Sequence, residues 1–140
     1  MSSARSVRFL SRSETEELDQ WVSLGMDIMA HYGIDQSRSV YSNLDTVYEA
    51  WAVEQAPRYS DEQVALGLGA VFGDRLRHKH RSDWQFVEDQ YGADFALPVR
   101  GREIYPIAFV AKRIATLAAP EPESGFFSGM DGVIDSWPPA

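Results

Sequence analysis

Apolar side chains recur with helical spacing through the first half of the chain. In residues 13–33 they share one face, Ser13 and Glu16 have the spacing of a capping box, and Gly33 is a favourable stop. The members of that face are Leu18, Trp21, Val22, Gly25, Ile28, Met29 and Tyr32. The pattern therefore predicts a long amphipathic helix, preceded by a flexible N-terminal arm over residues 1–12.

Two further helices are predicted before residue 80. Residues 43–55 repeat the apolar spacing over a shorter stretch, which ends before Pro57. The next helix opens with a capping box from Ser60 to Gln63 and runs from about Asp61 to about Lys79. Acidic residues in its first turn and basic residues in its last turn complement the helix dipole, which supports the assignment.

Beyond residue 82 the helical spacing gives way to aromatic and β-branched residues. Trp84–Glu88 and Ala93–Val99 predict a β-hairpin, and residues 103–106 offer a short third strand. Pro106 then opens a final helix that extends to about residue 118. We therefore predict an α+β fold, with a single domain over residues 13–118.

The last segment, residues 119–140, has an unusual composition. Four acids, four prolines and no basic residue are mixed with large apolar side chains. A plain acidic linker would lack those apolar groups. We predict an irregular acidic and apolar tail that packs along its own domain in preference to a partner.

Charge and composition narrow the classes of function. The 140 residues carry a net charge of −8 and include no cysteine, which excludes disulfides, thiolate metal ligands and cysteine nucleophiles. The acidic balance disfavours nucleic acids and favours a basic protein partner. No signal peptide or membrane-length apolar run is evident, so we expect a cytoplasmic protein that does not bind membranes.

Three glycines in the third predicted helix raise the question of nucleotide binding. Gly67, Gly69 and Gly73 are spaced G-x-G-x-x-x-G inside a capped helix, whereas a dinucleotide site needs G-x-G-x-x-G directly after a strand. Ala65, Gly69 and Gly73 instead recur every fourth residue. They predict a groove along the helix in which the final helix or the hairpin packs.

No pattern of catalytic or metal-binding residues emerges. His78 and His80 could share a metal only on an extended segment, and the basic residues around them disfavour a cation. We therefore expect no catalytic residue, no metal and no cofactor. An internal ion pair from Arg113 to Asp74 or Asp83 would fix the final helix against the rest of the domain.

The segments "LGLGAVFGDRL", "DWQFVEDQYGADFAL" and "IYPIAFVAKRI" resemble a family of small, uncharacterised bacterial domains. Their common frame is L-G-x-x-x-G-[D/E]-x-L, then D-W, then Y-G-x-D-x-A, and then a proline-led helix with a basic residue. The motif positions are Leu68, Gly69, Gly73, Asp74, Leu76, Asp83, Trp84, Tyr91, Gly92, Asp94, Ala96, Pro106, Val110, Lys112 and Arg113. The resemblance implies an α+β fold and a bacterial origin, but no activity. By type, such domains are similar to immunity proteins.

The sequence favours a non-enzymatic protein-binding domain, most specifically an immunity protein that covers the active surface of a cognate bacterial toxin. The predicted contact residues are Glu88, Asp89, Asp94, Phe126, Phe127, Asp131, Asp135 and Trp137. The alternative is an enzyme or small-ligand protein with a pocket between the glycine helix and the hairpin. Trp84 and Tyr91 would form its walls, and Asp83 or Arg113 would supply its polar group. An accessory structural module is a third option.

Overall fold

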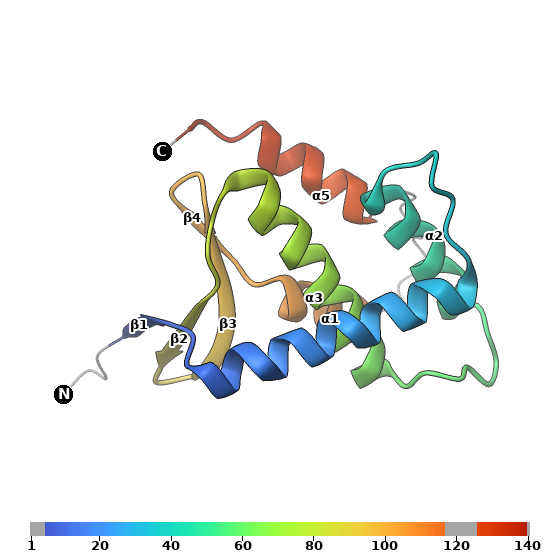
Figure 1. Cartoon of the computed structure of the whole chain (residues 1–140), viewed down its shortest axis with the longest axis horizontal. Coiled ribbons are helices and arrows are strands. Elements are labelled where there is room, and N and C mark those ends of the chain that lie inside the picture. Colours follow the sequence, from blue (N-terminus) through green and yellow to red (C-terminus); the bar gives the residue numbers. More distant parts are fainter. Residues whose placement is uncertain (1–4, 117–125, 140) are drawn as a thin grey trace.

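The computed structural model describes residues 5–116 and 126–139. Helices form most of the described chain, and the strands gather into one four-stranded sheet (Figure 1). The elements, in chain order, are β1 (Ser6–Phe9), α1 (Arg12–Tyr32), α2 (Val40–Ala52), α3 (Asp61–His80), β2 (Gln85–Asp89), β3 (Gly92–Val99), β4 (Arg102–Ile104), α4 (Pro106–Ala115) and α5 (Phe126–Asp135). The predicted α+β class is confirmed, including the three helices that precede the hairpin.

The glycine helix α3 lies at the centre of the fold, between α1 and α4, and its glycines allow both neighbours to come close (Figure 1). A Cβ added at Gly67 would lie 2.9 Å from the backbone nitrogen of Gly25 in α1. A Cβ added at Gly25 would lie 2.5 Å from Cγ2 of Val71 and closer still to the Gly67 carbonyl oxygen. The two helices therefore cross in backbone contact at Gly25 and Gly67.

The start of α4 packs against the other face of α3. A Cβ on Gly69 would lie 2.7 Å from Cα of Ile107, and one on Gly73 would lie 2.9 Å from Cγ of Pro106. The indole ring of Trp84 also packs on Gly73. The groove predicted from the glycine spacing is confirmed, and the helix predicted to open at Pro106 occupies it.

The sheet is antiparallel, in the order β1-β2-β3-β4, and its first strand was not predicted. Val7 pairs with Val87 and Phe9 pairs with Gln85, so part of the expected flexible arm is an edge strand. Val7 and Phe9 alternate with Ser6 and Arg8 as strand residues do, but all four are solvent-exposed, so β1 has no buried apolar face of its own. Its pairing with β2 therefore depends on the folded domain.

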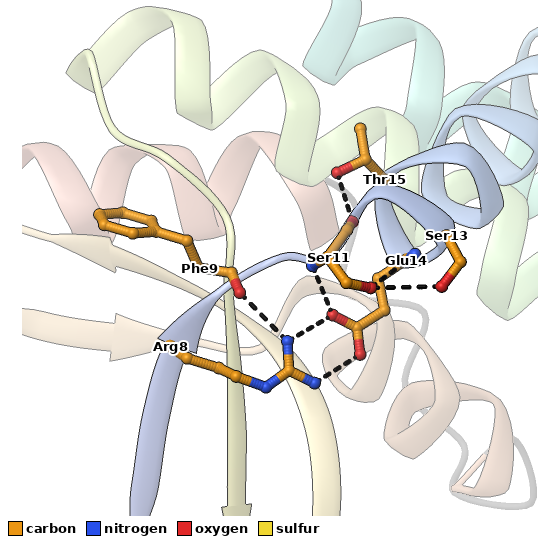
Figure 2. Close-up of polar contacts among 6 residues, drawn as sticks. All are labelled: Arg8, Phe9, Ser11, Ser13, Glu14 and Thr15. Carbon is orange, nitrogen blue, oxygen red and sulfur yellow. Dashed lines mark hydrogen bonds and ion pairs between the residues drawn. The ribbon is translucent and has the colours of Figure 1, made fainter.

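A compact network of polar contacts joins β1 to α1 (Figure 2). The Ser11 side chain accepts a bond from the Glu14 backbone nitrogen, and a Glu14 carboxylate oxygen accepts one from the Ser11 nitrogen. Both carboxylate oxygens of Glu14 also accept from the guanidinium of Arg8, each at 2.7 Å. The capping box is thus Ser11 with Glu14, and the prediction of Ser13 with Glu16 is wrong by two residues, since Ser11 and Glu14 have the same spacing and Glu14 also binds Arg8.

This network makes the Glu14 carboxyl unusually acidic. The bond from Arg8, followed by the bond from the Ser11 backbone, lowers its pKa from 4.5 to about 2. A depressed pKa in the folded state contributes stability that is present above the ordinary value and is lost as the pH falls through about 2. We expect Glu14→Gln to lower the Tm at pH 7, and the difference from wild type to shrink progressively below pH 4.5.

Circular dichroism melting between pH 7 and pH 2 measures this difference directly. Glu17→Gln is the matched control, because Glu17 is an exposed residue of the same helix. Its Tm difference from wild type should stay near zero throughout. A Glu14→Gln difference that does not vary with pH would contradict the role of this carboxyl.

The described part of the C-terminal tail, residues 126–139, contains helix α5. The prediction of an irregular tail is therefore wrong for these residues. The Asp45 carboxylate of α2 accepts bonds at the start of α5, from the backbone nitrogens of Phe127 at 2.5 Å and Ser128 at 3.3 Å. At the other end, Arg100 donates to the carbonyl oxygens of Asp135 and Trp137. Side chains from elsewhere in the fold therefore provide hydrogen-bond partners for the backbone at both ends of this helix. Residues 119–125 and 140 of the predicted tail lie outside the described residues.

Candidate functional site

The turn between β2 and β3 places an aromatic ring in solvent. Asp89 and Gly92 form the last pair of the hairpin, and an Asp89 carboxylate oxygen accepts a bond from the backbone nitrogen of Tyr91 at 2.8 Å. Gly92 has a φ of +136°, a conformation that glycine adopts without strain. The turn leaves Tyr91 88% exposed, the highest value among the large hydrophobic side chains that the structure describes.

Acidic and apolar groups lie on the strands beside this turn, with Glu88 on one face of the sheet and Val7, Asp89 and Asp94 on the other. Glu88 and Asp89 are exposed, and Asp94 is half-buried at the position that pairs with Val87. Val7, 43% exposed, lies on the other side of Val87 in β1. We call Val7, Glu88, Asp89, Tyr91 and Asp94 the hairpin patch.

The negative charge of the hairpin patch is only weakly compensated by its neighbours. The two arginines of the adjoining edge segment pair mainly with other residues: Arg8 pairs with Glu14 and is attracted more weakly to Glu88, and Arg5 pairs with Glu103. Burial raises the pKa of Asp94, and the bond from the Phe95 backbone nitrogen opposes that rise. The patch therefore presents a net negative surface around an exposed tyrosine.

The contact residues predicted in the C-terminal tail lie elsewhere and are engaged within the chain. Phe127 is fully buried, so its prediction as a contact residue is wrong. Phe126 stacks on Phe109 with ring centroids 4.3 Å apart, and the Arg102 guanidinium lies 4.8 Å from the Trp137 ring centroid. The tail's apolar groups thus complete the core, as expected for a tail that packs on its own domain.

The two predicted acidic contacts of the tail form an internal clamp. Asp131 and Asp135 each bind the ammonium group of Lys79 at 2.8 Å, which ties α5 to the end of α3. The bond from Lys79 is also the main reason that the pKa of Asp135 is lowered. These carboxylates are already paired, so they are less suited to recognise a basic partner than Glu88 and Asp89.

Two residues named for the pocket of the alternative hypothesis line a cavity. A cavity of about 310 Å³ is lined by Asp83 and Trp84, but its other walls come from α1, α3 and the end of β1. Tyr91 is not among its lining residues, and Arg113 lies with its guanidinium 5.2 Å from the Phe126 ring centroid. The cavity that Asp83 and Trp84 line therefore lies on the α1 side of α3, and the pocket between the glycine helix and the hairpin stays a prediction.

The motif residues named below lie in four places. Gly69, Gly73, Trp84 and Pro106 form the contact between α3, α4 and the hairpin, as described above. Asp74 and Asp83 line the 310 Å³ cavity, whereas Tyr91 and Gly92 form the hairpin turn. Lys112 is exposed on α4, close in sequence to Arg113.

The ion pair expected from Arg113 to Asp74 or Asp83 is not among the ion pairs of the described residues. Asp74 instead faces Arg77 at 3.4 Å within α3. In the same described ranges, no three histidine, aspartate or glutamate side chains gather as a metal site would require. Nor do those ranges contain a helix both long and apolar enough to cross a membrane.

Sequence reasoning missed Val7 as a surface group, because it lies in the segment expected to be a flexible arm. It also assigned Tyr91 to a pocket wall rather than to an exposed position. The useful signal for Tyr91 was the Asp89–Gly92 turn, since the central residues of a tight hairpin turn lie at the surface.

Comparisons with known proteins find a solved structure with a similar fold and identify a family. A crystal structure from Bacteroides thetaiotaomicron VPI-5482, determined at 1.50 Å, is similar with a TM-score of 0.66 and 12% sequence identity. The match covers 94% of this chain and 49% of that chain, so this chain spans about half its length, and the likeness concerns the fold alone. No curated protein matches the sequence. The family described as a domain of unknown function, DUF3806, matches residues 41–123, and the chain belongs to this family.

Proposed function

We propose that the protein is a non-enzymatic binding domain that recognises a basic protein surface through the hairpin patch. The observation that carries this proposal is Tyr91, which is 88% exposed in a turn that also exposes the carboxylates of Glu88 and Asp89. Tyrosine is enriched among residues that dominate binding energy, because it offers a large contact area with few rotatable bonds.

The charge of the chain supports the same partner class. A net charge of −8 attracts basic proteins over long range, and an acidic patch then orients them at short range. The hydrogen bond from Tyr91 to Asp89 fixes the turn before binding. Such preorganisation reduces the entropy cost of forming a complex.

The specific form of the proposal is an immunity protein whose partner is a bacterial toxin. Small size and acidic charge support this form, since toxins that act on nucleic acids present basic surfaces that a carboxylate-rich patch can cover. The prediction is that co-expression of this chain protects cells from a toxin encoded beside its gene. Unchanged killing in the presence of the folded protein would contradict the toxin-specific form.

Site-specific photo-crosslinking tests the more general binding proposal. A photoreactive amino acid in place of Tyr91 is expected to capture one protein in cells that naturally express the chain. The matched control is the same replacement at Val53, an 80% exposed side chain after α2 and outside the hairpin patch. Equal labelling at both positions, or none at Tyr91, would argue against the hairpin patch as the binding site.

A second candidate function is small-molecule binding in the 310 Å³ cavity. Its favouring observation is that Trp84 and the carboxylates of Asp74 and Asp83 line one cavity of a size that small ligands occupy. NMR titration with small organic amines separates the two candidates. Binding in the cavity would shift the amide signals of Leu18 and Asp83 but not that of Tyr91, whereas a partner at the hairpin patch would do the reverse.

A further inference from the structure

A second surface, on the side of α1 and α3, has a different chemistry from the hairpin patch. The 310 Å³ cavity adjoins a second cavity of about 340 Å³, because Val22 and Asp74 line both. We call these two adjoining cavities together the α1–α3 groove. It runs from the end of β1, along α1, to the connection between α1 and α2.

Exposed apolar side chains are spread along this groove. Phe9 lines the first cavity and is 69% exposed, whereas Met26 and Ile34 line the second and are 48% and 44% exposed. These are three of the seven large hydrophobic side chains that are exposed in the described part of the chain. Several exposed apolar side chains along one groove are typical of an interaction surface.

The two ends of the groove carry opposite charge. The first cavity is lined by Asp19 and Asp83, and the second by Arg38 and Arg75. Asp74, which lines both cavities, is paired with Arg77 of the first cavity. Within the described ranges, no ion pair involves Asp19, Asp83 or Arg75, and each of the three is exposed.

We propose that the α1–α3 groove binds a second copy of this chain, in a symmetric dimer. A two-fold axis near Val22 would place the acidic cavity of each copy against the basic cavity of the other. A two-fold interface uses the same surface on both copies, so it requires a surface that is complementary to itself. An apolar centre between an acidic end and a basic end meets that requirement.

The same reasoning separates this surface from the hairpin patch. Two copies that met through their hairpin patches would place carboxylates against carboxylates, which repel. The groove instead offers each Asp19 an unpaired Arg75 of the other copy. Self-association through the groove therefore leaves the hairpin patch free, and it does not depend on the proposed partner.

Sedimentation equilibrium of the purified chain with single and paired charge reversals tests this proposal. Asp19→Arg and Arg75→Asp, each alone, are expected to weaken the dimer at least tenfold, because each places like charges together across the axis. The variant with both changes is expected to recover most of that loss. Asp27→Arg is the matched control, since Asp27 is an exposed residue of α1 that lines neither cavity, and it should change the dimer little.

A wild-type chain that stays a monomer up to about 1 mM, where an association free energy of about 4 kcal/mol would still be detected, overturns the proposal. A dimer that the single reversals do not weaken overturns it equally. So does a double variant that is folded, as judged by circular dichroism, and associates no better than the single variants. Restoration by the double reversal supports it, because a structural defect in either single variant would not be repaired by the second change.

Discussion

Gly25→Ala is expected to destabilise the protein by about 2–3 kcal/mol, although alanine is the better helix former. Away from contacts the substitution would stabilise a helix by about 1 kcal/mol. At this position the new methyl group would meet Val71 and the Gly67 carbonyl. A backbone carbonyl in a packed helix cannot move aside as a flexible side chain can. The helices must therefore separate, and such overpacking commonly costs about 1–3 kcal/mol and at times more.

Urea denaturation of the variant measures this loss as a change in the free energy of unfolding. The expected loss corresponds to a fall in Tm of about 10 °C for a chain of this size. The α5 glycines provide a matched control, because a Cβ at Gly129 or Gly132 meets no atom within 4 Å. Gly129→Ala should stabilise by up to about 1 kcal/mol. If Gly25→Ala behaves like Gly129→Ala, then α1 and α3 do not cross in backbone contact.

Asp45→Ala is expected to cost about 3 kcal/mol, a comparable effect from a different cause. Asp45 is 8% exposed, and its carboxylate accepts bonds from the Phe127 and Ser128 backbone nitrogens and from the Ser128 hydroxyl. Its removal leaves buried donors at the start of α5 without a partner, at about 1–3 kcal/mol for such groups. The favourable interaction of a carboxylate with the helix dipole is lost as well.

Two milder substitutions separate these contributions. Asp45→Asn retains one acceptor oxygen but replaces the other with a donor, so an intermediate loss is expected. Ser128→Ala removes only the hydroxyl bond and should cost about 1 kcal/mol. Thermal and urea unfolding of the three variants gives the order directly. A loss below 1 kcal/mol for Asp45→Ala would show that α5 does not depend on this carboxylate.

The parts of the fold that follow from local rules could be predicted from the sequence. The Ser60–Gln63 capping box and the start of α4 at Pro106 depend on a few neighbouring residues, and both are confirmed. The glycine spacing also predicted the element that packs on α3. It did so because glycines in a helix are costly unless another element approaches closely.

Parts that depend on distant contacts could not be predicted in this way. Helix α5 begins at a carboxylate 82 residues away in the sequence, so no local signal marks its start. Strand β1 exists through pairing with β2, and Arg8 of that strand in turn binds the glutamate of the α1 capping box. Local rules were insufficient at each of these positions.

The same distinction applies to the candidate site. Glu88 and Asp89 lie beside a turn that the sequence marks clearly, and the structure leaves both exposed. Phe127 was predicted as a contact residue because the tail mixes large apolar side chains with acidic ones. The core that it joins instead is assembled from α2, α3 and α4, where Phe127 packs against Tyr48, Phe72 and Phe109.

The affinity of the partner captured at Tyr91 for charge-neutralised variants tests the central proposal most directly. Glu88→Gln with Asp89→Asn removes two negative charges from the hairpin patch, and Asp27→Asn with Glu49→Gln removes two from exposed helix positions. Both variants have the same net charge, so they differ only in where charge is lost. We predict that the first weakens binding at least tenfold, about 1.4 kcal/mol, and that the second changes it little. Equal affinities for the two variants would contradict recognition through the hairpin patch.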